Sequence, residues 1–313
     1  MNKITVIGSG NVGSTIAYTL TIMGLASEIV MIDVNEEKSL GEALDIRQGV
    51  SFCSPASVYA GTYSDASGSD IVIITSGMAR KPGQSRLDLA QTNVDIIKSI
   101  ADKIVPVAPN ATYVIVSNPV DILTYVFLKH TRLPQERVIG SGTMLDTARL
   151  RSRISEYYSV NQKNVHAYVL GEHGDSSFVP WSLANISNVP IEMFKNAILT
   201  KSDYPEFVKS EAEDYMRKSG ARVIQRKGAT FYAVSISVCH ICKCLLDGID
   251  TTLTVSTMLN GEYDISDVCL SVLNVVGKKG AHSKIMLPLN DEEIAKLHNS
   301  ANVLKGLIKD LNI

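Results

Sequence analysis

The first 142 residues alternate between short apolar runs and longer segments whose apolar positions recur at helical spacing. The apolar runs cover residues 4–8, 28–33, 70–75 and 112–119. Such runs are typical of strands that are buried on both faces. Helical spacing covers residues 11–24, 37–50 and 87–103, and a last apolar run, 138–142, closes this half. Strands that alternate with helices predict an α/β fold, a doubly wound parallel sheet with helices on both faces.

The pattern changes after residue 143, where helices and antiparallel strands are mixed. Helical spacing covers residues 145–158, 205–218 and 230–246, and β-rich runs then flank Asn260-Gly261. That dipeptide favours a two-residue hairpin turn. A C-terminal helix from Asp291 has one apolar face, made of Ile294, Leu297, Ala301, Leu304 and Ile308. We expect an N-terminal domain over residues 1–142 and an α+β domain over residues 143–313, with no linker between them.

Composition narrows the class of protein. The chain has 313 residues, of which 45% are hydrophobic and 20% charged, and a formal net charge of -2. A charge this small does not favour nucleic acid or a membrane surface as partner. Five cysteines do not suggest a disulfide framework, and the start MNKITVIGSG does not resemble a signal peptide. We expect a cytoplasmic protein without a membrane span.

The segment GSGNVG follows the first predicted strand and opens the first predicted helix. Its glycines, Gly8, Gly10 and Gly13, fit G-x-G-x-x-G, with Asn11 and Val12 between the last two. In this context the motif indicates a dinucleotide whose diphosphate lies on the helix N-terminus. Asp33 ends the second strand 20 residues after Gly13, where an acidic residue accepts the ribose hydroxyls and favours NAD over NADP. The alternative is a cluster of turn glycines beside a surface aspartate.

Three further segments carry polar residues suited to chemistry on an anion. GMARKPGQSR holds Arg80, Lys81 and Arg86 between backbone-breaking glycine and proline residues, so it is either a solvated turn or a lid that brings positive charge onto a substrate. GEHGDS places His173 between two glycines, as a candidate proton donor or as a structural histidine. In LDTARLR, Asp146 and Arg149 are three apart and share a helix face, which also fits a surface salt bridge.

The chain resembles the L-lactate/malate dehydrogenase family over essentially its whole length. The matching segments, in order, are VIGSGNVG, Asp33, TSGMARKPGQSRLDL, VSNPVD, GSGTMLDTARLR, GEHGDSSFVPWS and KGATFY. The resemblance implies an NAD-binding Rossmann domain followed by a substrate domain, a small 2-oxo or 2-hydroxy acid as substrate, and a homo-oligomer, either dimer or tetramer.

The same resemblance implies roles for individual residues. His173 would be the acid/base, Asp146 would hold its imidazole, and Arg149 would bind the substrate carboxylate. Arg86 would polarise the reacting carbonyl. Asn118 would lie near the nicotinamide or the substrate oxygen, and Thr230 would line the far end of the substrate.

The residue before Lys-Pro-Gly bears on substrate choice. In the family it is usually glutamine in lactate dehydrogenases and arginine in malate dehydrogenases, and here it is Arg80. An arginine there would pair the second carboxylate of oxaloacetate, so we predict oxaloacetate/L-malate as substrates. Thr230 and the segments RLDL and HGDSSFVPW resemble lactate dehydrogenase instead, which keeps pyruvate/L-lactate as the alternative.

Other readings stay open at the level of sequence. Arg151 and His166 match positions where many bacterial lactate dehydrogenases bind fructose 1,6-bisphosphate, though a surface arginine and a packed histidine fit equally. An NAD-dependent glycosidase would want a metal ligand set, and a non-catalytic NAD-binding sensor would not need the polar residues above. CHICKC has a lone C-x-x-C in an apolar helix, so we expect packed free thiols and no metal.

Overall fold

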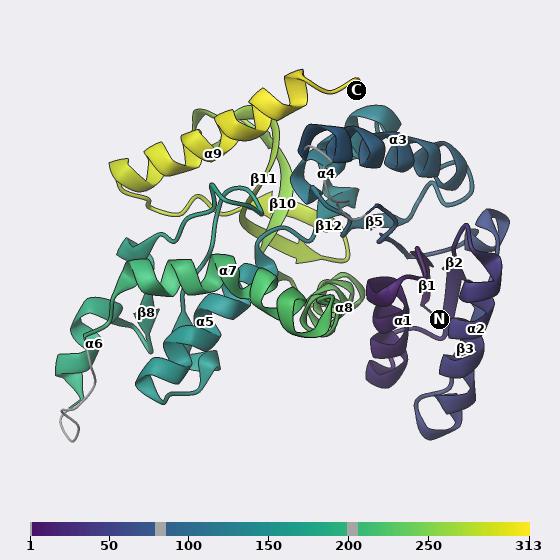
Figure 1. Ribbon diagram of the computed structural model, residues 1–313, viewed down its shortest axis with the longest axis horizontal. Coiled ribbons are helices and arrows are strands. Elements are labelled where there is room, and N and C mark those ends of the chain that lie inside the picture. The colour runs from purple at the N-terminus through teal and green to yellow at the C-terminus, as the bar shows by residue number, and fades with distance from the viewer. Residues whose placement is uncertain (1, 79–85, 199–205) are drawn as a thin grey trace.

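The computed structural model describes residues 2–78, 86–198 and 206–313 (Figure 1). Its strands are β1 (Lys3–Ile7), β2 (Glu28–Ile32), β3 (Ser57–Ala60), β4 (Ile71–Ile74), β5 (Thr112–Ile115), β6 (Val138–Gly140), β7 (Val165–His166), β8 (Asn185–Ile186), β9 (Val189–Pro190), β10 (Thr251–Asn260), β11 (Ser266–Gly277) and β12 (Gly280–Lys284). Its helices are α1 (Asn11–Met23), α2 (Glu36–Gly49), α3 (Arg86–Ile104), α4 (Val120–Thr131), α5 (Met144–Tyr158), α6 (Ile191–Ala197), α7 (Lys209–Lys227), α8 (Tyr232–Leu246) and α9 (Asp291–Lys309).

One large sheet runs through both halves of the chain. Nine of the described strands form it in the order β12-β11-β10-β6-β5-β4-β1-β2-β3. Strands β1 to β6 pair in parallel with one another, whereas β10, β11 and β12 pair in antiparallel with their neighbours. The two parts join where Ser256 of β10 pairs with Gly140 of β6. The predicted α/β fold with an α+β second half is confirmed, and the second half extends the first sheet.

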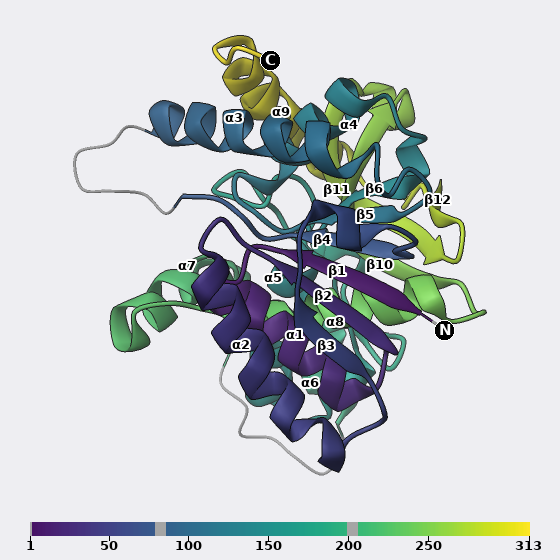
Figure 2. The ribbon, with the colours of Figure 1, turned by 90° about the vertical axis from the view of Figure 1, so that its right-hand side faces the viewer.

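Alternate residues of the parallel strands feed two hydrophobic cores. On one face, Val72 and Ile74 of β4 pack with the inner sides of α3 and α4; on the other, Ile71 and Ile73 pack with α1, α2 and α8. Figure 2 shows these helices in layers above and below the strands. A strand buried on both faces needs apolar residues throughout, which explains its unbroken apolar run. A third core, around Leu150 and Ile154, lies between α5, α7 and the small β7-β8-β9 sheet.

The order of the parallel strands reverses at β1. Its neighbours are β2 on one side and β4 on the other, so the chain leaving β1 and the chain leaving β4 diverge at the carboxyl ends of these strands. A ligand crevice lies at such a point in open α/β sheets. The segment Gly8–Gly10 and residues Thr75 and Ser76 meet there.

Three local predictions differ from the structure. Residues 120–131 form α4, which was not predicted from the sequence, because all of its first nine residues are buried and no polar face marks a helical period. The turn after Asn260 is longer than two residues, since β11 begins only at Ser266. The helix predicted over 205–218 begins at Lys209 and continues to Lys227.

Candidate functional site

The N-terminus of α1 is open toward the crevice. Gly10 is its N-cap and no side chain caps it, so its first N–H groups are available to an anion. A Cβ on Gly10 would have nothing within 4 Å, whereas a Cβ on Gly13 would lie 1.7 Å from the Gly8 carbonyl oxygen. Gly8 has φ +102°, a backbone conformation that favours glycine. The three glycines therefore leave space for a ligand at one position and let α1 approach β1 at the others.

Asp33 lies at the end of β2, next to this helix terminus. Its carboxylate accepts hydrogen bonds from the backbone N–H groups of Ser9, at 2.5 Å, and Asn35, at 2.9 Å. These contacts hold the carboxylate beside the glycine segment, half-buried, where a ribose would present its hydroxyls. Its negative charge disfavours a 2′-phosphate at the same place.

Asn118 lies at the end of the chain segment that follows β5, before a cis peptide bond to Pro119. Its side chain is exposed, and its carbonyl oxygen accepts a hydrogen bond from the buried Asn93, at 2.8 Å. Asn93 also bonds both the N–H and the carbonyl of Met78. The side-chain amide of Asn93, on α3, thus connects Asn118 with Met78, the second residue of the segment GMARKPGQSR.

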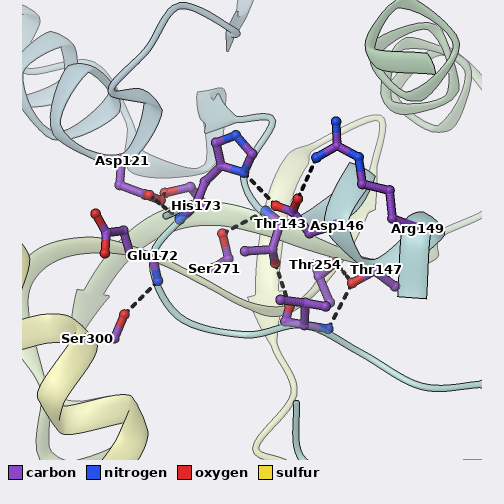
Figure 3. Close-up of polar contacts among 12 residues, drawn as sticks. Asp121, Thr143, Asp146, Thr147, Arg149, Glu172, His173, Thr254, Ser271 and Ser300 are labelled. Atoms are coloured by element: carbon purple, nitrogen blue, oxygen red, sulfur yellow. Dashed lines mark hydrogen bonds and ion pairs between the residues drawn. The ribbon is translucent and has the colours of Figure 1, made fainter. Parts of the chain in front are cut away.

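His173, Asp146 and Arg149 are in direct contact (Figure 3). The distance from His173 Nδ1 to Asp146 Oδ2 is 2.5 Å, and from Arg149 Nη1 to Asp146 Oδ1 it is 2.9 Å. Asp146 has 8% of its side chain exposed and Arg149 17%, so one buried carboxylate serves two cations. With Nδ1 engaged, the other ring nitrogen of His173 is left for a ligand.

The charges of this cluster shift one another's protonation. Burial alone would lower the pKa of His173, but the Asp146 carboxylate outweighs it, and the pKa of His173 lies above its usual 6.5. Burial likewise would raise the pKa of Asp146, whereas His173 and Arg149 together lower it below 3.8. Asp146 is therefore ionised near neutral pH and favours the imidazolium form of His173.

The segment that carries His173 is fixed by contacts that were not predicted from the sequence. Asp121, in the first turn of α4, accepts a hydrogen bond from the backbone N–H of His173 at 2.7 Å and one from the Ser256 hydroxyl at 2.5 Å. The hydroxyl of Ser300 on α9 accepts one from the backbone N–H of Glu172 at 2.7 Å. Gly171, with φ +93°, leaves room for that serine. Asp121 lies in the family segment VSNPVD, three residues after the predicted site residue Asn118. This proximity in sequence was the signal that could have indicated a role for Asp121 at the site.

Of the remaining candidates, Thr230 lies in the part of the chain that the structure describes, whereas the side chains of Arg80 and Arg86 do not. Thr230 is half-buried between α7 and α8, and Gly220 of α7 faces Arg149, since a Cβ there would lie 3.6 Å from Arg149 Nη2. Arg80 lies outside the described residues. Arg86 is the first residue of α3, and its side chain is likewise not among those described.

Arg151 and His166 belong to neighbouring elements, α5 and β7. Arg151 on α5 donates from Nε to the Ala167 carbonyl oxygen at 2.9 Å and lies over the Tyr168 ring. His166 on β7 is exposed and precedes Ala167. Because Arg151 bonds to Ala167, the residue that follows His166, the two basic residues are neighbours in the structure.

The cysteines of CHICKC are packed inside the molecule. Cys239, Cys242 and Cys244 are free thiols on the buried side of α8, and burial raises the pKa of each. Throughout residues 2–78, 86–198 and 206–313, no group of three or more His, Cys, Asp or Glu residues is arranged to hold a metal ion. No helix in those ranges is long and apolar enough to cross a membrane.

Family models match both halves of the chain. Residues 2–140 match the NAD binding domain of lactate/malate dehydrogenase, and residues 143–312 match its alpha/beta C-terminal domain. The chain belongs to the lactate/malate dehydrogenase family. The resemblance drawn from the motifs is confirmed, and so is the prediction of NAD as cofactor.

Individual members of the lactate/malate dehydrogenase family match along their whole length. An L-lactate dehydrogenase of Thermoanaerobacter pseudethanolicus is 47% identical over 100% of both chains. One of Acetivibrio thermocellus is 44% identical over 100% of this chain and 98% of its own. Among solved structures, the ligand-bound minor L-lactate dehydrogenase of Enterococcus mundtii has a TM-score of 0.94 and 37% identity, covering 100% of this chain and 99% of that one.

The nucleotide end fits the cofactor of this family. The open N-terminus of α1, the space beside Gly10 and the Asp33 carboxylate match the diphosphate and ribose of NAD in charge and hydrogen-bonding type. The chain is an NAD-dependent oxidoreductase, and the rival class of non-catalytic sensors loses support because the polar cluster at His173 is complete among the described residues.

Proposed function

We propose that the protein is an L-lactate dehydrogenase, which reversibly reduces pyruvate to L-lactate with NADH. The observation that carries this proposal is the contact of His173 and Arg149 with one buried carboxylate, that of Asp146. Relatives that are 43–47% identical bear the name L-lactate dehydrogenase. Their names favour pyruvate/L-lactate, the alternative predicted from the sequence, over oxaloacetate/L-malate.

Each residue of the site has its own role toward a 2-oxo acid in this proposal. Arg149 binds the substrate carboxylate with the guanidinium N–H groups that do not face Asp146. His173, protonated, donates a proton from Nε2 to the carbonyl oxygen as that oxygen becomes an alkoxide. Bound NADH supplies the hydride. Asp146 holds the imidazole through Nδ1 and stabilises its charge before the proton is transferred, and the role of Arg86 is to polarise the carbonyl.

Oxaloacetate remains the second candidate because of Arg80 alone. The guanidinium of Arg80 would form an ion pair with the second carboxylate of oxaloacetate, whereas pyruvate has a methyl group at the same end. Both substrates should therefore be compared by kcat/KM with NADH in the unmodified protein and in Arg80→Gln. A higher kcat/KM for pyruvate supports lactate dehydrogenase. A higher value for oxaloacetate that Arg80→Gln reverses would establish malate dehydrogenase instead.

His173→Asn tests the proton donor. We expect kcat to fall on the order of 10²–10⁴-fold, the range that a positioned general acid contributes. NADH binding, measured by fluorescence titration, should stay within about twofold, because His173 contacts Asp146 and not the N-terminus of α1. As control, His298→Asn changes a histidine on α9 and should leave turnover unchanged. Near-normal turnover of His173→Asn would assign the proton to another group.

Exposed apolar side chains support self-association, as the family resemblance implies. Helix α1 packs against both α2 and α8, and all three expose large apolar side chains. These are Tyr18, Ile22, Leu40, Leu44, Tyr232 and Ile236. A second copy of the chain would remove them from water, as expected of an oligomer interface. Sedimentation velocity distinguishes the proposed dimer or tetramer from a monomer.

A further inference from the structure

Asp121 is a buried carboxylate at the catalytic histidine. Its side chain is 3% exposed and accepts two hydrogen bonds, from the backbone N–H of His173 to Oδ2 and from the Ser256 hydroxyl to Oδ1. Ser256 in turn is fully buried on β10, opposite Gly140. His173 is thus held at two points, at its main chain by Asp121 and at its imidazole by Asp146 (Figure 3).

The stability of the fold does not explain this carboxylate. Burial raises the pKa of Asp121 to about 6, although the Ser256 hydroxyl and the His173 N–H offset part of the effect. A carboxyl group whose pKa is higher in the folded chain than in the unfolded chain destabilises the fold at pH values above both. Near neutral pH the ionised Asp121 therefore costs stability. Such a charge is retained more readily where it serves the site.

The charges around Asp121 favour a role at His173. Asp121 contributes to the raised pKa of His173, after Asp146, and His173 favours the ionised form of Asp121. The other titratable groups that face it are Glu172, whose charge opposes its ionisation, and the Cys269 thiol, which burial keeps neutral. Asp146 on α5 thus contacts the imidazole of His173, while Asp121 on α4 contacts the backbone N–H of the same residue.

The geometry points to Asp121 as a positioning residue, which fixes the backbone at His173 and, as a second anion, keeps its imidazole protonated for the reduction. Asp121 touches neither ring nitrogen of His173, so it acts through that residue and not on the substrate. The inference rests on the proposed function for its catalytic consequence. Its electrostatic part concerns the imidazole alone and can be measured without substrate.

Asp121→Asn and Ser256→Ala separate the charge from the contact. The asparagine keeps an oxygen that accepts from the His173 N–H, and its amide group can donate to the Ser256 oxygen, so only the charge is lost. Ser256→Ala keeps the carboxylate and removes one donor, which raises the pKa of Asp121 further. Glu293→Gln is the matched control, because Glu293 is also a buried carboxylate that accepts from a backbone N–H and a serine hydroxyl, those of Ser182.

The first measurement is an NMR titration of ¹³C-labelled histidine in the protein, with His173→Asn to assign the signal. We expect the pKa of His173 to fall by about one unit in Asp121→Asn, less in Ser256→Ala, and not at all in Glu293→Gln. The second is the pH profile of kcat/KM for pyruvate reduction, whose alkaline limb should move to lower pH by the same amount, with NADH affinity within about twofold.

The outcomes distinguish this inference from the proposed function. An unchanged His173 titration in Asp121→Asn overturns the inference whatever the activity, and so does a loss of thermal stability without a shift. If Asp121→Asn does not fold, the titration of Ser256→Ala decides in the same way. If the unmodified protein reduces neither pyruvate nor oxaloacetate, the proposed function fails, while the titration still tests the link between Asp121 and His173.

Discussion

At the scale of residues, the site depends on one carboxylate shared by two cations. Asp146 receives His173 on one oxygen and Arg149 on the other, so both side chains are oriented by the same buried group. In the proposed mechanism, the guanidinium of Arg149 and the imidazole of His173 would therefore need little reorganisation to bind a 2-oxo acid and donate a proton to it. In that mechanism, Asp146 would also connect the residue that binds the substrate, Arg149, with the residue that donates the proton, His173.

Asp146→Asn should change the pH dependence of turnover. The amide keeps the shape of the side chain but removes the charge that raises the pKa of His173, so that pKa should drop below its present value. In the proposed mechanism, reduction needs the imidazolium form of His173 and is lost as pH rises through this pKa. The alkaline limb of kcat/KM for pyruvate reduction should therefore move to lower pH, and kcat near neutral pH should fall more than tenfold. A limb that stays in place would mean that Asp146 does not set the protonation of His173.

Asp33→Ser should narrow the preference for NADH over NADPH. The carboxylate at the end of β2 would meet a 2′-phosphate as a like charge, and a serine hydroxyl would not. We expect the ratio of kcat/KM values to shrink at least about tenfold, equivalent to about 1.4 kcal/mol. Asp45→Ser, an exposed change on α2, serves as control and should keep the ratio. Equal use of both cofactors by the unmodified protein would refute the role of Asp33.

At the scale of elements, the glycines at the start of α1 have different tasks. Gly13→Ala would place a Cβ 1.7 Å from the Gly8 carbonyl oxygen, which is backbone and cannot turn away. Either α1 or β1 must shift, and we expect the free energy of unfolding to fall by about 3 kcal/mol or more. Gly10→Ala has open space and φ -72°, so stability should change by less than about 0.5 kcal/mol while NADH binding weakens.

Urea denaturation measures the free energy of unfolding of both variants, and Gly41→Ala serves as their control. Gly41 is exposed within α2 with nothing near a would-be Cβ, so alanine there should stabilise the protein by about 0.5–1 kcal/mol. Equal stability of Gly13→Ala and Gly41→Ala would show that α1 can move away from β1 without loss.

The sequence predicted those elements whose pattern carries a period or a clear end. The strand that leads into Gly8 and the helix that begins at Asn11 follow from an apolar run, a glycine motif and a spacing. Helix α4 did not, because its side chains are buried on nearly every side and no amphipathic period remains. The turn at Gly261 was misjudged because a dipeptide favours a turn type but does not fix where β11 resumes pairing.

The same reason separates the site residues that were foreseen from those that were not. Asp146 and Arg149 are three apart on one helix, so their proximity is local and readable. The contact of Asp121 with the His173 backbone joins residues 52 positions apart and depends on how α4 packs under the histidine segment. Contacts of this kind arise only when the sheet and its helices assemble.

At the scale of the whole molecule, the continuous sheet brings the two halves to one site. Residues 171 and 271 pair through their backbones, so the segment before His173 is anchored to β11, while Asp121 on α4 holds it from the first half. The nucleotide end and the histidine segment therefore belong to one hydrogen-bonded framework. If a ligand bound between two copies of the chain, this framework would connect its binding site with the His173 segment.

A pair of neighbouring basic residues is a candidate site for such a ligand. Arg151 is half-buried on α5, with Nε engaged by the Ala167 carbonyl, and His166 lies exposed on the adjacent strand β7. We propose that fructose 1,6-bisphosphate binds these two basic groups, with one phosphate on this chain and the other on a second copy, because two phosphates can bridge two like sites.

The effector should then lower the apparent KM for pyruvate severalfold and increase the sedimentation coefficient, since binding to the associated form draws the equilibrium toward it. Arg151→Gln and His166→Gln should each remove both effects without changing kcat in the absence of effector, whereas Lys163→Gln, an exposed charge just before β7, should keep them. Kinetics and sedimentation that do not respond to millimolar effector would contradict the proposal. Arg151 would then serve α5 only through its contacts with Ala167 and Tyr168, which fasten that helix to the strand segment leading to His173.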